Sequence, residues 1–394
     1  MTAAATDRAE LDAIARESIS FLTSFGRPSA SEGERRAADW IASRLRSEGC
    51  PARVEQERAH GTYWWPLGLM AGAAAAASLS SRRVVRTLAG AAAAAGIADD
   101  VSGGRLWFRR ALPRRATWNV VATAGDQAAD KTVVFVAHHD AAHWSLLFAP
   151  QVPEFFARRF PKALEKADTT PPVMFPVVGG PLLVALGGLT GLGWLRRAGF
   201  AVSLGTAATM AEIGSRSTVD GANDNLSGVA TLLGLARSLR ERPVAGVRVM
   251  LVSTGSEESF MEGMHGFAAR HFPGLPLEST SFVCLDTVGS PELMMLEGEG
   301  MLVMRDYPED FKALVSECAA AAGVPLRRGL RLRNATDGLI ALKAGYPAVM
   351  IGSINEFKAP SNYHWPTDTA ENVCYDTVVE AALVCEAIVR RLGD

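Results

Sequence analysis

The chain has 394 residues, which is long enough for one large domain with insertions or for roughly two or three ordinary domains. Hydrophobic residues make up 48% of it and charged residues 21%, so a long disordered polypeptide is excluded and a sizeable core is expected. The formal net charge of -2 provides no positive field that would attract nucleic acid, and we expect no nucleic-acid partner.

The amino-terminal region predicts helices and no targeting segment. Six charged residues interrupt positions 1–22, which leaves no apolar core of the length that a cleaved signal peptide needs. We therefore expect no cleaved signal peptide and a protein that is cytoplasmic or membrane-associated. An amphipathic helix is predicted from Asp7 to Phe25, and Ser31 with Glu34 forms a capping-box pattern that opens a second helix, which runs to about Ser47.

Continuous apolar runs predict the strands of a sheet. Such runs are typical of strands that are buried on both faces, and a helical pattern follows the turn at 221–228. This alternation of strands and helices favours a layered α/β sandwich. The predicted strands are Thr117 to Thr123, Thr132 to Ala137, Val247 to Ser253, Phe282 to Leu285 and Pro347 to Gly352.

Two long uncharged segments do not fit this alternation. The first spans 61–81 and continues at 87–98 after three arginines, and the second spans 169–195 and continues to 211 after two more. Both patterns predict apolar helical hairpins with arginines at their tips. We expect a single domain over 1–394, interrupted by these hairpins as insertions at 61–115 and 145–215. The tip arginines are Arg82, Arg83, Arg86, Arg196 and Arg197.

The hairpins leave two interpretations open. A helix needs about 20 apolar residues to cross a bilayer, so the first arm of each hairpin qualifies by length and the second arm does not comfortably do so. Small residues favour close helix packing in soluble proteins as well as in membranes. The segments 61–98 and 169–211 therefore predict either membrane association or a cap on the active site.

Residues with the chemistry of metal ligands follow the predicted strands. His138 and Asp140 stand at the end of the run at 132–137, where ligands gather in parallel sheets, and the carboxylate can orient the imidazole. Asp224 lies in a glycine-flanked turn before a helix, where capping is its alternative role. Glu257 and Glu258 follow the run at 247–253, and adjacent carboxylates repel each other unless a cation holds at least one of them ionised.

Two further residues complete the set, because Asp286 follows the run at 282–285 and His364 lies in the carboxyl-terminal loop. Each residue is ordinary when taken alone, since lone histidines and acidic pairs are more often structural or solvated. Together they offer nitrogen and oxygen ligands without sulfur, enough for two zinc ions that share one carboxylate. The five candidate metal ligands are His138, Asp224, Glu258, Asp286 and His364.

The sequence at this point resembles the two-zinc aminopeptidases, a family that also includes glutamate carboxypeptidase II and, as a variant, glutaminyl cyclase. The resemblance covers about 31–60, 116–140 and 219–394. Its matching pieces are AHHD at 137–140, GANDNLSGVA at 221–230, STGSEES at 253–259, CLDTVG at 284–289, TDGLIALKAGYPAV at 336–349 and NYHWPTDTAENV at 362–373.

The resemblance implies a three-layer α/β/α sandwich with a mostly parallel, mixed central sheet and a site for two Zn²⁺ ions. It makes Asp224 the carboxylate that both ions share. One ion would be bound by His138 and Asp286, and the other by Glu258 and His364.

The resemblance also implies the catalytic roles. Glu257 would be the general base that takes a proton from a zinc-bridging water and passes it to the leaving amine, and Asp140 would orient His138. His139 stands where the family has a residue that is not a ligand, so we expect it to be a neighbour of the site. The predicted function is a zinc-dependent exopeptidase, an aminopeptidase that acts on peptides with a free amino terminus.

Two alternatives stay open: a glutaminyl-cyclase-like or amidohydrolase activity on the same scaffold, and a non-catalytic membrane-associated protein that kept the fold. The chain departs from the family between Asp140 and Asp224, which are 84 positions apart where the family has a short connection. We hypothesise that the second hairpin forms a lid or a membrane anchor that restricts access to the site.

Overall fold

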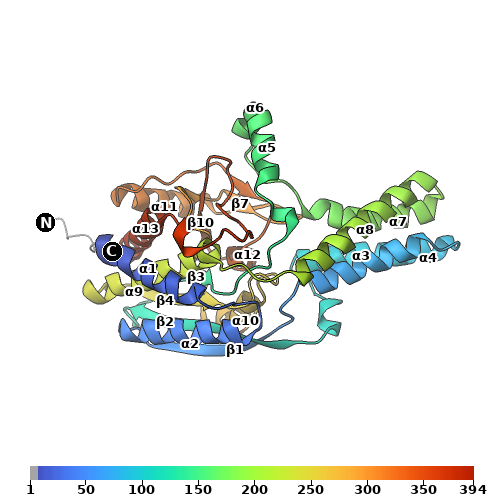
Figure 1. Ribbon diagram of the computed structural model, residues 1–394. Coiled ribbons are helices and arrows are strands. Elements are labelled where there is room, and N and C mark those ends of the chain that lie inside the picture. Colours follow the sequence, from blue (N-terminus) through green and yellow to red (C-terminus); the bar gives the residue numbers. More distant parts are fainter. Residues whose placement is uncertain (1–7) are drawn as a thin grey trace.

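The computed structural model describes residues 8–394 (Figure 1), so Asp7 of the first predicted helix lies outside the described residues. A seven-stranded sheet of order β1-β2-β4-β3-β5-β10-β6 runs through the molecule. All five predicted strands belong to it, whereas the edge strands β1 and β6 were not predicted. The strands are β1 (Ala52–Ala59), β2 (Arg115–Gly125), β3 (Thr132–His138), β4 (Arg248–Thr254), β5 (Thr280–Leu285), β6 (Glu292–Met295) and β10 (Ala348–Ile354).

The four central strands are parallel, and the outer pairs are antiparallel. β3 pairs in parallel with β4 and β5, and β10 pairs in parallel with β5. In this register His138 at the end of β3 lies opposite Thr254 at the end of β4. Residues that follow the central strands therefore start from the same edge of the sheet, which is where ligands bind in folds of this type.

Helices cover both faces of the sheet. β3 sends Val133 and Phe135 into one hydrophobic cluster and Val134 and Val136 into the other, because side chains alternate along a strand. The predicted three-layer α/β/α sandwich is confirmed. The first face carries α1 (Arg8–Thr23), α2 (Glu32–Ser47), α9 (Ser227–Glu241), α11 (Glu309–Ala321) and α13 (Tyr375–Gly393), and the second face carries α10 (Glu262–His271) and α12 (Asp337–Ala344).

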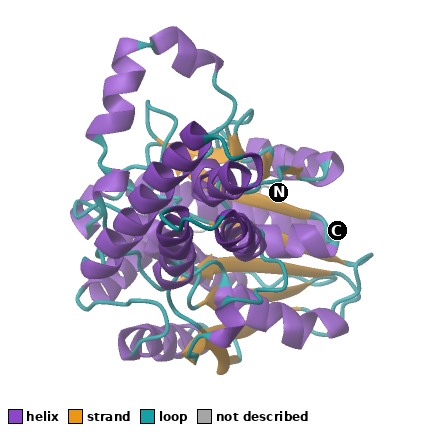
Figure 2. Cartoon of the chain, turned by 90° about the vertical axis from the view of Figure 1, so that its right-hand side faces the viewer, coloured by secondary structure: helices purple, strands orange, loops and turns teal. Residues whose placement is uncertain are grey.

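Two helical hairpins pack into one arm that projects from the sandwich (Figure 1). The first hairpin is α3 (Trp64–Ser78) with α4 (Arg83–Val101), and the second is α7 (Met174–Thr190) with α8 (Gly193–Ser215). α4 packs against α7, and α3 packs against α8. Glycine permits this close packing, since a side chain at Gly90 would collide with the backbone of Ala185. Figure 2 views the molecule from the side of this arm.

The second insertion contains more than the predicted hairpin. Between β3 and α7, the short helices α5 (Gln151–Arg159) and α6 (Pro161–Lys166) form a separate projection (Figure 1). A small sheet of order β8-β7-β9 lies outside the central one. It is formed by β7 (Gly298–Glu299), β8 (Arg305–Asp306) and β9 (Arg331–Leu332).

Across residues 8–394, no helix combines the length and the apolar character that crossing a membrane requires. The expectation that the first arm of each hairpin has the length of a bilayer crossing is therefore wrong. α3 is 15 residues long and is followed by a turn that contains Ser80 and Ser81, while α7 is 17 residues long and ends at the left-handed Gly191. At a rise of about 1.5 Å per residue, both are shorter than the hydrocarbon core of about 30 Å.

Candidate metal centre

The predicted ligands meet at the edge of the sheet where the parallel strands end. Three strands of the sheet deliver side chains to this place, and the turn before α9 and the carboxyl-terminal loop deliver one each. The contributors are His138 at the end of β3, Glu257 and Glu258 after β4, Asp286 after β5, Asp224 before α9, and His364 between β10 and α13.

Asp224 lies between two groups of side chains. Its Oδ1 atom is 3.2 Å from Nε2 of His138, and its Oδ2 atom is 3.2 Å from Nε2 of His364. Ligand atoms of His138, Asp224 and Asp286 lie within 4.8 Å of one another, and so do those of Asp224, Glu258 and His364. The structure thus brings the five predicted ligands together in two groups that share one carboxylate. That they bind zinc stays a prediction.

The donor set fits divalent cations. Burial raises the pKa of Asp286 well above its usual value and also raises the pKa of Glu258, and in both cases the charge of Asp224 acts in the same direction. Oε1 of Glu258 is buried and has no hydrogen-bond partner among the described residues. Buried carboxylates of this kind are stabilised by a cation, and nitrogen with oxygen donors suits zinc.

Protons compete with a metal ion for the imidazole nitrogens of the two histidines. Burial alone would lower the pKa of His364, but Glu258 and Asp224 outweigh it and raise this pKa to about 10. In the same way, burial opposes protonation of His138, yet its hydrogen bonds with Asp140 and Asp224 raise its pKa well above the usual value. A metal ion must therefore displace a proton from each imidazole before that imidazole can bind it.

Glu257 lies beside the two groups. Its Oε2 atom is 3.8 Å from Nε2 of His138. Burial raises the pKa of its carboxyl group well above the usual value, and the nearby charges of Asp337 and Glu258 act in the same direction. A raised carboxyl pKa suits a group that accepts a proton near neutral pH. Because Glu257 also comes within 4.8 Å of His138 and Glu258, the alternative to a general-base role is that of a ligand.

Asp140 connects the histidine with both glutamates. Its Oδ1 atom lies 3.4 Å from Nδ1 of His138 and accepts the backbone N–H of Glu257 at 3.0 Å. Its Oδ2 atom accepts the N–H of Glu258 at 3.2 Å and the hydroxyl of Ser29 at 2.6 Å. Nδ1 of His138 also lies 3.3 Å from the backbone carbonyl of Asp140, so both the carbonyl and the carboxylate are placed to orient the imidazole. The carboxylate also fixes the backbone of the loop after β4.

We expect the Asp140→Asn variant to bind zinc about 10- to 100-fold more weakly, the usual effect of losing a partner that orients a metal ligand. The amide has one oxygen acceptor in place of the two carboxylate oxygens, so one glutamate N–H loses its hydrogen-bond partner. The imidazole also loses its charged neighbour. Zinc titration against a competing chelator measures the change. Asp130→Asn, an exchange at an exposed aspartate, is the control and should bind zinc as the parent does. Equal affinities in both variants would contradict the orienting role.

Two residues that support the site were not predicted. Arg27 is fully buried and donates to the carbonyl groups of His139 at 2.9 Å and Asp220 at 2.6 Å, so it ties the end of β3 to the turn that carries Asp224. Asp368 accepts the backbone N–H of Asp224 at 3.1 Å. These partners lie between 112 and 193 positions apart in the sequence. The only sequence signal is that Asp368 belongs to the matching piece at 362–373.

Glu34 combines a predicted local role with an unpredicted distant one. The hydroxyl of Ser31 accepts its N–H at 3.2 Å, as the capping-box pattern implies. Its carboxylate accepts the N–H of Trp118 at 2.9 Å and the hydroxyl of Ser256 at 3.0 Å, and its burial raises its pKa to about 8. The start of α2 therefore supports the loop that carries Glu257, through the hydrogen bond between Ser256 and Glu34.

His139 follows the predicted ligand His138 in the chain but contacts Ser253 instead of the ligand groups. Its ring is fully buried, and its Nδ1 atom is 2.8 Å from the hydroxyl of Ser253. Burial lowers the pKa of this ring to about 3, so it stays neutral. None of the candidate metal groups of residues 8–394 includes it.

Two aromatic rings pack against the ring of His364. The ring of Tyr363 stacks on it with the centroids 3.9 Å apart, and Phe148 meets it edge-on at 4.6 Å. Phe148 belongs to the second insertion and precedes α5. The insertion therefore reaches the site through this segment, whereas α7 and α8 pack against the first hairpin in the arm.

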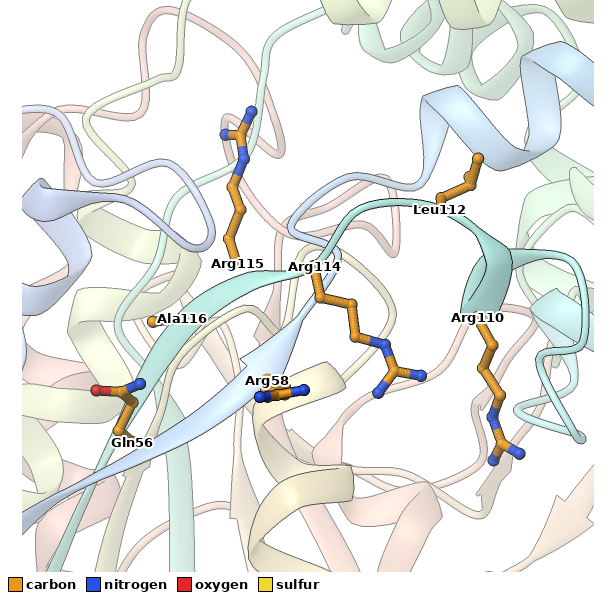
Figure 3. A pocket seen from close by; sticks show the side chains of 7 residues that line it. All are labelled: Gln56, Arg58, Arg110, Leu112, Arg114, Arg115 and Ala116. Carbon is orange, nitrogen blue, oxygen red and sulfur yellow. The ribbon is translucent and has the colours of Figure 1, made fainter.

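A separate hollow of about 580 Å³ shares no residue with the predicted ligands (Figure 3). Four exposed arginines contribute to its wall, and we call them the foot arginines: Arg58, Arg110, Arg114 and Arg115. The other lining residues are Gln56, Leu112 and Ala116. An arginine-lined hollow does not offer metal ligands, because guanidinium groups stay protonated.

Comparisons with known proteins confirm the resemblance that the motifs indicate. Residues 206–389 match the sequence family described as Peptidase family M28. This range contains every predicted ligand except His138. A comparison with curated proteins finds no match.

Solved structures of similar fold include aminopeptidases, exopeptidases and glutaminyl cyclases. An aminopeptidase from Aneurinibacillus sp. strain AM-1 has a TM-score of 0.53 at 15% identity, over 96% of this chain and 93% of that one. A glutaminyl cyclase from Tannerella forsythia has a TM-score of 0.58 at 14% identity, over 98% and 99%. A Zn-dependent exopeptidase from Parabacteroides distasonis has a TM-score of 0.54 at 14% identity, over 98% and 99%. At these identities the likeness shows the fold alone.

Proposed function

We propose that the chain is a zinc-dependent exopeptidase of the aminopeptidase type, which removes amino-terminal residues from peptides. The observation that carries the proposal is the position of Asp224, whose two oxygens each lie 3.2 Å from a different histidine. A carboxylate placed in this way can bind two zinc ions at once. The match to Peptidase family M28 and the fold shared with aminopeptidases support the same conclusion.

The ligand assignment follows the two groups of side chains. His138 and Asp286 would hold one ion, Glu258 and His364 the other, and Asp224 both. Lewis acidity toward the scissile carbonyl and toward the attacking water is the chemistry that a bound zinc pair supplies.

Proton transfer is the task of Glu257. Its carboxylate would accept a proton from the attacking water and donate it to the nitrogen of the leaving amine. Asp140 holds the backbone N–H of Glu257 at 3.0 Å, which limits where the carboxylate can reach. The rings of Phe148 and Tyr363 form a wall beside His364, where they would exclude water from one side of the substrate.

Removal and return of the metal test this proposal. The purified chain should contain close to two zinc ions and should hydrolyse aminoacyl anilides, and a chelator should abolish this hydrolysis until zinc is added back. The apparent zinc affinity should rise with pH between about 6 and 9, because His364, with a pKa of about 10, gives up a proton when it binds metal. A stable chain without metal and without hydrolysis would instead support a non-catalytic scaffold.

A cyclase is the second candidate, because glutaminyl cyclases share the fold. A peptide with an amino-terminal glutamine separates the two activities. Release of ammonia with the peptide chain left intact would assign the cyclase, whereas release of a free amino acid supports the aminopeptidase.

A further inference from the structure

The far end of the arm exposes large apolar side chains. We define the arm tip as residues 79–88 and 186–197, which include the two turns between the paired helices. Five of its side chains leave between 64% and 68% of their surface in solvent, namely Leu79, Val84, Leu88, Leu189 and Trp194. Exposed apolar groups that gather on one surface mark sites of contact with a protein or a membrane.

The same tip is strongly basic. It carries Arg82, Arg83, Arg86, Arg196 and Arg197, and no Asp or Glu occurs anywhere in 61–98 or 169–211. Within the part of the chain that the structure describes, none of these five guanidinium groups forms an ion pair. The tip therefore carries five positive charges without a carboxylate partner among the described residues. Arg82, Arg83 and Arg197 are exposed, whereas Arg86 and Arg196 are half-buried.

The two hairpins form this surface together. Arg196 on α8 donates to the carbonyl of Ser78 on α3 at 3.3 Å. At Gly188 on α7, an added side chain would collide with Thr87 on α4. Both contacts join one hairpin to the other, so the arginines and the apolar side chains lie on one packed unit.

We propose that the arm tip docks on a membrane surface that contains anionic lipids. Arginines meet the phosphates of such lipids, tryptophan favours the level of the headgroups, and leucine and valine enter the adjacent acyl region. A second copy of this chain is a poor binding partner for the tip. A symmetric contact would place five arginines against five others, and their positive charges would repel. Docking by the tip needs no helix that crosses the bilayer, in agreement with the lengths of α3 and α7.

The arm also fixes how the metal centre would sit above the membrane. At its base, Trp64 of α3 packs on the ring of His143 with the centroids 4.5 Å apart. The N–H of Trp144 donates to Ser217 at 3.2 Å, and the N–H of Val219 donates to Ala142 at 2.9 Å. These contacts join the arm to the segment that follows Asp140. The 23 residues of α8 are about 34 Å long, so docking would hold the site roughly one arm length from the lipid.

Vesicle binding of the zinc-loaded chain tests the proposal. We expect binding to phosphatidylcholine vesicles that contain about 30% phosphatidylglycerol, and little binding to pure phosphatidylcholine. The triple variant Arg82→Gln, Arg83→Gln, Arg197→Gln should bind roughly 100-fold more weakly, because each arginine near an anionic surface contributes about fivefold. Its hydrolysis of a soluble anilide should be unchanged, which also shows that the variant is folded.

The foot arginines provide the matched control. The variant Arg58→Gln, Arg110→Gln, Arg114→Gln removes the same charge from exposed positions (Figure 3) and should weaken vesicle binding by no more than about threefold. Equal losses in the two triple variants would show attraction by net charge and would overturn the assignment to the tip. Equal binding to both kinds of vesicle, no binding to either, or a dimer that the tip substitutions dissociate would overturn the proposal as well.

Discussion

The Glu257→Gln variant should keep its zinc and lose at least about 100-fold in kcat, the usual scale for removal of a general base. Glutamine keeps the size of the side chain, but its amide cannot accept the proton of the attacking water. The distance of 3.8 Å between Oε2 and His138 places the native carboxylate beside the ligands, and the hydrogen bond from its N–H to Asp140 does not depend on the side chain. Elemental analysis and steady-state kinetics on the same sample measure both quantities.

The neighbouring glutamate provides the sharpest comparison. Glu258→Gln removes a predicted ligand and should lose zinc together with activity, whereas Glu278→Gln changes an exposed glutamate and should alter neither. If Glu257→Gln lost zinc in proportion to activity, Glu257 would be a ligand, as its proximity to His138 and Glu258 allows.

The Asp224→Asn variant should lose affinity for both zinc ions by more than about 100-fold, a larger effect than the loss of an orienting partner produces. Burial would raise the pKa of Asp224, but its hydrogen bonds with His138 and His364 hold this pKa well below the usual value. Both oxygens are therefore charged acceptors, and asparagine replaces one of them with an amide NH₂ that cannot bind a metal. Zinc titration should show both binding events weakened.

Asp220→Asn is the control for this variant, because it makes the same exchange at an exposed position in the same turn. It should bind two zinc ions as the parent does. Zinc affinity in Asp224→Asn equal to that of the parent for both ions would refute the shared position.

The sequence predicts the centre of the sheet well because its strands are buried on both faces. All seven side chains of β3 are buried, and its apolar run is visible in the sequence. The edge strand β1 was missed because it reads ARVEQERA and lacks both an apolar run and a clean alternation. It is held by pairing with β2 over its whole length, which is a distant contact that no local pattern carries.

Four predicted ligands could be singled out because His138, Glu258 and Asp286 follow strands and Asp224 lies in a glycine-flanked turn. His364 lies in a loop and was singled out with the matching piece at 362–373. Their supports could not be found in this way. Arg27, Glu34 and Asp368 act through partners far away in the chain, and nothing in their local sequence distinguishes them from a surface arginine, a helix cap and a loop aspartate.

For the hairpins too, the local sequence predicts the helices but not how they pack together. Their ranges and their arginine tips were readable from the uncharged runs, but their assembly into one arm depends on contacts between α4 and α7 and between α3 and α8. The helices α5 and α6 lie inside the second insertion and carry charged residues, so the apolar pattern that revealed the hairpins did not extend to them.

Anomalous diffraction from crystals of the zinc-loaded chain, recorded above and below the zinc absorption edge, tests the shared metal centre most directly. Two peaks about 3.5–4 Å apart are expected, one beside His138 and Asp286 and the other beside Glu258 and His364, with Asp224 in contact with both. A single peak, or peaks that Asp224 does not join, would contradict the account.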